Sequence, residues 1–105
     1  MNEDSKPLGS TARQTLGTGT FGEGPSGKAS ARMFRVLPGQ DVDYVLEQSS
    51  LLMDCVYKLT REASLERDDT LVLAAYYLSG MAKALAEDVT MTRMLAAGSD
   101  GQRQR

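Results

Sequence analysis

The chain has 105 residues, of which 41% are hydrophobic and 25% charged, with a formal net charge of −2, so it has room for one small domain at most. It contains no His, which removes the side chain best suited to general base catalysis near neutral pH and the commonest metal ligand. We therefore expect a protein that is not an enzyme and that binds no cofactor.

Cysteine usage and hydropathy suggest where the protein works. The single Cys55 cannot form a disulfide within the chain, and residues 1–6 are polar with no apolar run behind them, unlike a secretory signal. The longest apolar stretch, residues 71–78, is far shorter than the roughly 18 residues of a membrane span. We expect a soluble, cytoplasmic protein with no membrane partner.

The first 32 residues are dominated by Gly, Ser and Thr and show neither the helical nor the strand period, which predicts a disordered, flexible N-terminal arm. Within it, residues 17–22 fit the G-x-G-x-x-G template and residues 22–29 come close to a phosphate-binding P-loop. Such loops work only when strands and a helix hold their amides against the phosphates, and the arm predicts neither. A solvated linker is the favoured interpretation of both motifs.

A short extended segment follows at residues 33–40. Met33 to Val36 alternate in a way that is compatible with a very short strand, and Pro38-Gly39 is a turn signal.

The helical period begins at Asp41, a good N-cap. Counting about 100° per residue places one apolar stripe on this first helix, made of Val45, Leu52, Val56, Leu59 and Ala63. Leu46 and Met53 widen the stripe on one flank and Leu51 and Cys55 on the other, an arc wider than one neighbouring helix covers. Cys55 is interpreted as a small buried hydrophobe, with pairing to the same residue of a second chain as the alternative.

A short polar turn at residues 64–69 leads into a second helix, with Asp68 or Asp69 as its N-cap. A connection this short predicts antiparallel packing. The second helix is expected to end before Gly98, so that residues 41–96 form the hairpin and residues 97–105 a flexible tail. Its predicted inner face consists of Leu71, Ala74, Ala75, Leu78, Met81, Ala82, Leu85 and Val89.

The fold class is therefore all-α, an antiparallel two-helix hairpin that we expect to dimerise into a four-helix bundle. A hairpin of this size without a disulfide or metal is too small to bury its own apolar surface. The side chains expected to bind a partner are those outside the two inner stripes: Leu46, Leu51, Met53, Val72, Leu73, Tyr76 and Tyr77.

Two functions are compatible with this fold. The first is a non-enzymatic interaction module that binds itself or a regulatory protein. The second is a nucleic-acid-associated regulator whose flexible basic arms contact phosphates through Arg13, Lys28, Arg32, Arg35, Arg93, Arg103 and Arg105. Residues 41–92 carry four basic and ten acidic groups, which argues against nucleic acid as the main ligand.

Three sequence motifs resemble a family of short bacterial proteins classed as domain of unknown function 3077. They are Phe34-x-Val36-x-Pro38-Gly39, Leu46-x-x-x-Ser50-Leu51-Leu52-x-x-Cys55 and Ala75-x-Tyr77-Leu78-x-x-Met81-Ala82-Lys83-Ala84-Leu85. Upstream, Thr15-Leu16-Gly17-x-x-Thr20-Phe21 extends the similarity. The resemblance implies a small helical module without known catalysis and supplies no site residues. Gly80 departs from the family pattern, in which an acidic residue precedes Met-Ala-Lys, and a glycine inside a helix costs about 1 kcal/mol relative to Ala.

Overall fold

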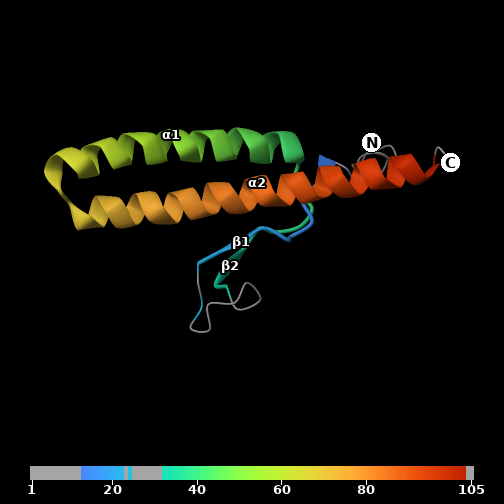
Figure 1. The fold of residues 1–105 in the computed structure, drawn as a ribbon, viewed down its shortest axis with the longest axis horizontal. Coiled ribbons are helices and arrows are strands. Elements are labelled where there is room, and N and C mark those ends of the chain that lie inside the picture. Colours follow the sequence, from blue (N-terminus) through green and yellow to red (C-terminus); the bar gives the residue numbers. More distant parts are fainter. Residues whose placement is uncertain (1–12, 23, 25–31, 104–105) are drawn as a thin grey trace, which may run out of the picture.

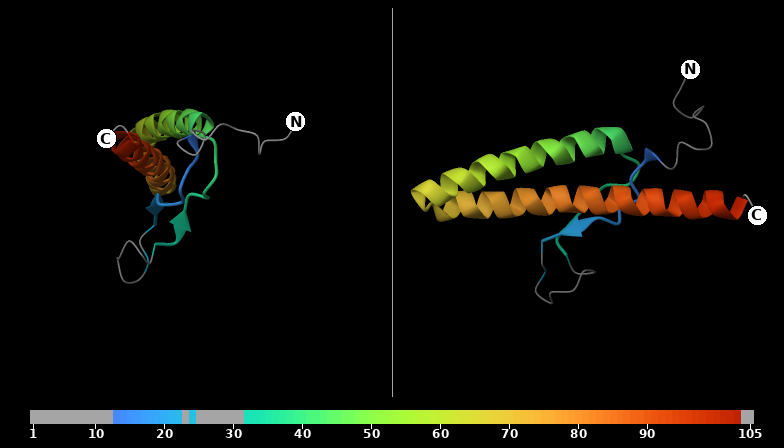
Figure 2. Two further views of the ribbon diagram at one scale, coloured as in Figure 1. Left: turned by 90° about the vertical axis from the view of Figure 1, so that its right-hand side faces the viewer. Right: turned by 45° about the horizontal axis from the view of Figure 1, so that its top comes forward.

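Two antiparallel helices dominate the computed structural model, which describes residues 13–22, 24 and 32–103. The elements are β1 (Thr20–Phe21), β2 (Phe34–Arg35), α1 (Val42–Glu66) and α2 (Asp69–Arg103). The helices pack along each other, and the two short strands lie on the side of α2 away from α1 (Figures 1 and 2). The predicted two-helix hairpin is confirmed. Residues 1–12, 23, 25–31 and 104–105, which include most of the expected arm, lie outside the described part of the chain.

Helix α1 begins where its capping residue predicts. The Asp41 carboxylate accepts the Tyr44 N–H at 3.0 Å, which satisfies one of the free amides of the first turn. The helix ends at Glu66, because Arg67 adopts a left-handed conformation (φ 54°) and its N–H donates to the Ala63 carbonyl at 2.7 Å. The turn predicted for residues 64–69 therefore shrinks to two residues, since Leu65 and Glu66 are good helix formers that continue α1.

Helix α2 is capped by Asp68, whose Oδ1 accepts the N–H of Thr70 at 2.9 Å. It continues through Gly98 to Arg103, so the predicted stop before Gly98 and the flexible tail from residue 97 are wrong. One glycine costs only about 1 kcal/mol, and the strong helix formers just before it carry the helix on. Because Val42 at the start of α1 packs beside Val89, residues 90–103 extend past α1 as an overhang (Figure 1).

The seam between the helices is built from small side chains. Val42, Val45 and Val89 form a buried cluster, with Leu46 and Leu85 half-buried against it. Toward the interhelical turn the buried hydrophobic residues are Ala63, Ala75 and Ala82, all three predicted on the inner faces, and their small side chains let the helices approach closely. Met81, expected on the inner face, is 39% exposed instead. Among the described residues, no Leu, Met, Phe or Tyr side chain is buried.

The strand predicted between Met33 and Val36 is present as β2, and Gly39 makes the expected turn with a φ of 83°. Its partner β1 was not predicted. The strands pair antiparallel with Thr20 opposite Arg35, and the Phe21 and Phe34 rings stack with centroids 4.7 Å apart. Residues 13–22, which we expected to lie in a flexible arm, thus have a defined structure, because backbone pairing with residues 33–40 holds them.

Candidate functional site

The glycine-rich segment that resembles a nucleotide-binding loop holds a carboxylate of its own chain. Asp88 of α2 is 0% exposed and accepts the backbone N–H groups of Leu16 at 2.6 Å, Gly17 at 2.9 Å and Gly19 at 3.0 Å. Hydrogen bonds from amides to a carboxylate are stronger than those between neutral groups, and they replace the water that burial removes. Two amides of the G-x-G-x-x-G segment, those of Gly17 and Gly19, are therefore already bound to a carboxylate of the protein itself.

The glycines of this segment let it approach α2 closely. A Cβ atom on Gly19 would overlap the Ala84 carbonyl oxygen, and Gly17 has a φ of 84°, which side chains other than glycine rarely adopt. Thr92, one helical turn after Asp88, donates its hydroxyl to the Gln14 carbonyl at 3.0 Å. We name this set of contacts, between residues 14–19 and the α2 residues Ala84, Asp88 and Thr92, the Asp88 clasp.

Sequence reasoning found the glycine motif but missed Asp88. The sequence does contain a signal for it. Asp88 lies one helical turn from both Ala84 and Thr92, and such a row of short side chains allows a backbone segment to lie close to the helix. The hydrogen bonds join residues 69 to 72 positions apart, so no local pattern connects them.

An apolar groove lies between α1 and α2 at the end of the hairpin that carries the interhelical turn. Its walls are Val56, Thr60, Ala63 and Ser64 of α1 and Val72, Ala75, Tyr76 and Ser79 of α2. An adjoining hollow shares Val56, Thr60 and Ser64 and adds Met53, Tyr57 and Arg61. We name the two together the distal groove.

The structure brings together three of the side chains predicted to bind a partner. Val72 and Tyr76 line the distal groove and Met53 lines its continuation on α1. Their exposed fractions of 54%, 57% and 48% leave about half of each side chain available. Tyr57, 72% exposed, also lines the groove and was missed, although it lies one helical turn from Met53.

The other predicted partner-binding residues lie elsewhere. Leu46 is half-buried against the core cluster. Leu51, Leu73 and Tyr77 are exposed but are not among the residues that line the groove, although the Tyr77 ring packs edge to face on Tyr76 with centroids 5.4 Å apart. These four residues remain predictions as partner contacts.

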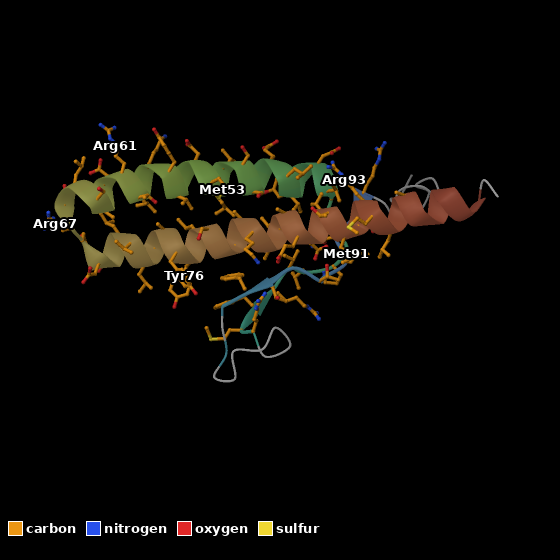
Figure 3. The ribbon with its side chains drawn as sticks, in the orientation of Figure 1. Met53, Arg61, Arg67, Tyr76, Met91 and Arg93 are labelled. Carbon is orange, nitrogen blue, oxygen red and sulfur yellow. The ribbon has the colours of Figure 1, made fainter. Side chains whose placement is uncertain are left out.

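A second set of exposed apolar side chains lies on the overhang of α2. Met91, Met94 and Leu95 are 39%, 62% and 58% exposed. Met91 and Met94 border a shallow hollow that also includes Lys83 and Glu87, whose Nζ and Oε2 atoms form an exposed ion pair at 2.7 Å. Figure 3 shows Tyr76 and Met91 at different levels along the same helix.

The structure also places Cys55 and several of the basic residues that were expected to contact phosphates. Cys55 is exposed, which corrects its interpretation as a buried hydrophobe, because the flank of α1 on which it lies faces away from the seam. Arg32, one of the basic residues expected to contact phosphates, donates to the Thr20 hydroxyl at 3.2 Å. Lys28 and Arg105 lie outside the described residues, whereas Arg35 and Arg93 are exposed.

Neither metal chemistry nor a membrane span is indicated for the part of the chain that the structure describes. No three carboxylate or thiol side chains there come close enough to share a metal ion. Neither helix contains a segment both long and apolar enough to cross a bilayer.

Comparison with known protein families identifies a match. A family model described as "Protein of unknown function (DUF3077)" matches residues 15–92. No curated protein and no solved structure matches the chain. The matched region begins at Thr15 and ends at Thr92, so it contains nearly all of the Asp88 clasp together with the distal groove, but only the first residues of the overhang.

Proposed function

Because the chain belongs to the DUF3077 family of proteins of unknown function, we propose from its own surface that it is a non-enzymatic protein-interaction module. It associates through the apolar side chains that its two helices leave exposed around the distal groove. A second copy of the chain is the first candidate partner, since twofold homodimers are the commonest oligomers, and a regulatory protein is the second.

One observation carries this proposal: within the described residues, the buried hydrophobic side chains are only valines and alanines. A stable domain normally buries its large apolar residues, and a hairpin of two helices has no third layer with which to do so. Tyr57, Val72, Tyr76 and Met94 are instead more than half exposed. Covering them with another helical surface removes apolar area from water at about 25 cal/mol per Å², which favours association.

The charge distribution is compatible with a protein partner. Of the residues that line the distal groove, Arg61 is the one with a charged side chain, although residues 41–92 carry ten acidic and four basic groups. An apolar centre with charges at its edge is the usual arrangement of a protein–protein interface.

The test is the mass of the purified full chain by light scattering from low to high micromolar concentration. We expect a dimer that Tyr76→Ser converts to a monomer. Tyr44→Ser is the matched control, since Tyr44 is exposed to the same extent (58% against 57%) but lines a hollow that includes Met81 and Leu85 rather than the distal groove. The proposal is contradicted if the wild-type chain stays monomeric and also captures no host protein whose binding Tyr76→Ser abolishes.

The nucleic-acid alternative makes a different prediction for the same material. Binding of random duplex DNA that weakens steeply with salt would support contacts to phosphates through the basic residues. The interaction module predicts no such binding.

A further inference from the structure

We infer that the distal groove is occupied by the α2 overhang of a second copy of this chain, placed antiparallel, so that each copy fills the groove of the other. The inference rests on the proposed function and specifies its partner and arrangement. Three features of α2 carry it: a common face, a symmetric spacing and a self-complementary pair of charges.

The groove and the overhang share one face of α2. At 100° per residue, Val72, Tyr76, Lys83, Glu87 and Met94 all fall within about 60° of one another around the helix axis. Val72 and Tyr76 line the distal groove, and the other three line the hollow that extends toward the overhang. A helix laid along this face would therefore contact all five residues.

The apolar groups are spaced equally about the ion pair. The midpoint between Lys83 and Glu87 is position 85; Tyr76 precedes it by nine residues and Met94 follows it by nine. Each residue lies about 14 Å from that midpoint along the helix. A twofold axis through position 85 thus places Tyr76 of one copy opposite Met94 of the other, and the contact occurs twice in the dimer.

The same axis brings opposite charges together. Lys83 of one copy meets Glu87 of the second, and Glu87 of the first meets Lys83 of the second. These are the charged α2 side chains among the residues that line the two hollows on this face, and both are exposed. The α2 side chains of this face therefore sum to zero charge and are self-complementary, although the hairpin as a whole is acidic, and Arg32 adds one positive charge to the lining of the same hollow.

The area available is close to what a dimer needs. Met53, Tyr57, Val72 and Tyr76 around the groove, and Met91 and Met94 on the overhang, are 39% to 72% exposed. A large side chain in this range offers about 100 Å², so the set amounts to roughly 600 Å² per copy, against about 800 Å² per partner in a standard interface. The overhang has no α1 residues beside it in its own copy, so a second copy supplies its missing neighbour (Figure 1).

Two single charge reversals, studied apart and mixed, test the ion pairs. Lys83→Glu places two pairs of carboxylates opposite each other in the homodimer, and Glu87→Lys places two pairs of ammonium groups there. Each variant homodimer should have a roughly tenfold higher Kd than the wild-type dimer. An equimolar mixture of the two variants should form a heterodimer with wild-type affinity. The pair within each chain stays broken in both variants, so it cannot cause the recovery. A mixture that binds no more tightly than either variant alone overturns the arrangement.

Crosslinking tests the register independently. In a Cys55→Ser background, the Val72→Cys/Gly98→Cys chain should be joined efficiently into a covalent dimer by a short bismaleimide reagent, because the same axis places residue 72 of one copy opposite residue 98 of the other while Tyr76 and Met94 stay in place. Tyr44→Cys/Gly98→Cys is the control and should not be joined, because Tyr44 lies on another face. If the wild-type chain and the 72/98 variant both have dimer mass but the variant does not crosslink, this inference is overturned and the proposed function stands. A monomeric wild-type chain overturns this inference, and it overturns the proposed function as well only if the chain also captures no protein from its host.

Discussion

Asp88 is the largest fully buried side chain among the described residues, and it connects parts of the chain that are far apart in sequence. Burying a carboxylate without partners costs several kcal/mol, so this position is tolerated only because the amides of Leu16, Gly17 and Gly19 surround it. The glycine-rich segment and Asp88 therefore depend on each other.

Replacement of Asp88 by Asn should destabilise the protein by about 3 kcal/mol. One side-chain oxygen would become an NH₂ group that cannot accept the N–H groups now bound to it, which leaves buried donors facing each other. Chemical denaturation followed by circular dichroism measures the change in free energy of unfolding.

Asp54→Asn is the matched control for that substitution. Asp54 forms an exposed pair with Lys58 at 3.3 Å, so its replacement should change stability by less than about 0.5 kcal/mol. If Asp88→Asn changes the free energy of unfolding no more than Asp54→Asn does, the three amide hydrogen bonds of Asp88 contribute no net stability.

At the level of elements, α2 contains two glycines whose surroundings differ. A Cβ atom on Gly80 would lie 2.9 Å from a ring carbon of Phe21, whereas at Gly98 it would meet nothing within 4 Å. A glycine at position 80 thus has a physical reason, because it lets the Phe21 ring of β1 rest directly on the helix.

The same substitution at these two positions should have opposite effects. Gly98→Ala should stabilise the protein by up to about 1 kcal/mol, since Ala is the better helix former and the site is open. Gly80→Ala gains the same propensity but must displace the ring, and it should be net destabilising by about 1 kcal/mol or more. Thermal unfolding of the two variants beside wild type gives the comparison, and a rise in Tm for Gly80→Ala would contradict the Phe21 contact.

At the scale of the whole molecule, the described structure is held together by the small buried core between the two helices and by the Asp88 clasp. Its buried cluster of Val42, Val45 and Val89 lies at one end, while the groove opens at the other. Backbone amides near an open groove or on an overhang are expected to exchange faster than those in the clasp, because few buried contacts protect them.

Hydrogen exchange at low and high protein concentration should reveal which regions associate. We expect residues 72–79 and 90–98 to exchange roughly tenfold more slowly in the dimer than in the monomer, because both segments become covered together. The amides of Leu16, Gly17 and Gly19 serve as an internal control, since their hydrogen bonds to Asp88 lie within one chain and should not depend on concentration. Protection of one segment without the other would contradict the reciprocal packing.

The helices themselves were predictable because their signals are local. Asp41 and Asp68 cap as their residue types predict, and the 3.6-residue period correctly placed Val45, Ala75 and Val89 on the inner faces. The ends were less predictable, because the left-handed Arg67 and the continuation through Gly98 depend on small energy differences that neighbouring residues reverse.

The candidate site was predictable only in part, for a different reason. Periodicity identified Met53, Val72 and Tyr76 as side chains outside the inner stripes, but it could not show that they border one groove, nor that Leu73 and Tyr77 do not. Which exposed residues share a surface depends on how two helices are rotated and offset against each other, and sequence spacing within one helix does not contain that information.

The amino-acid sequence by itself determined two amphipathic helices joined by a short turn, since hydrogen bonds between near neighbours and the placement of apolar residues set both. Only the tertiary structure decided that Asp88 holds the glycine-rich segment and that α2 runs past α1. Those features arise from contacts between residues up to 78 positions apart, where the free energy depends on distances in space that no local pattern encodes.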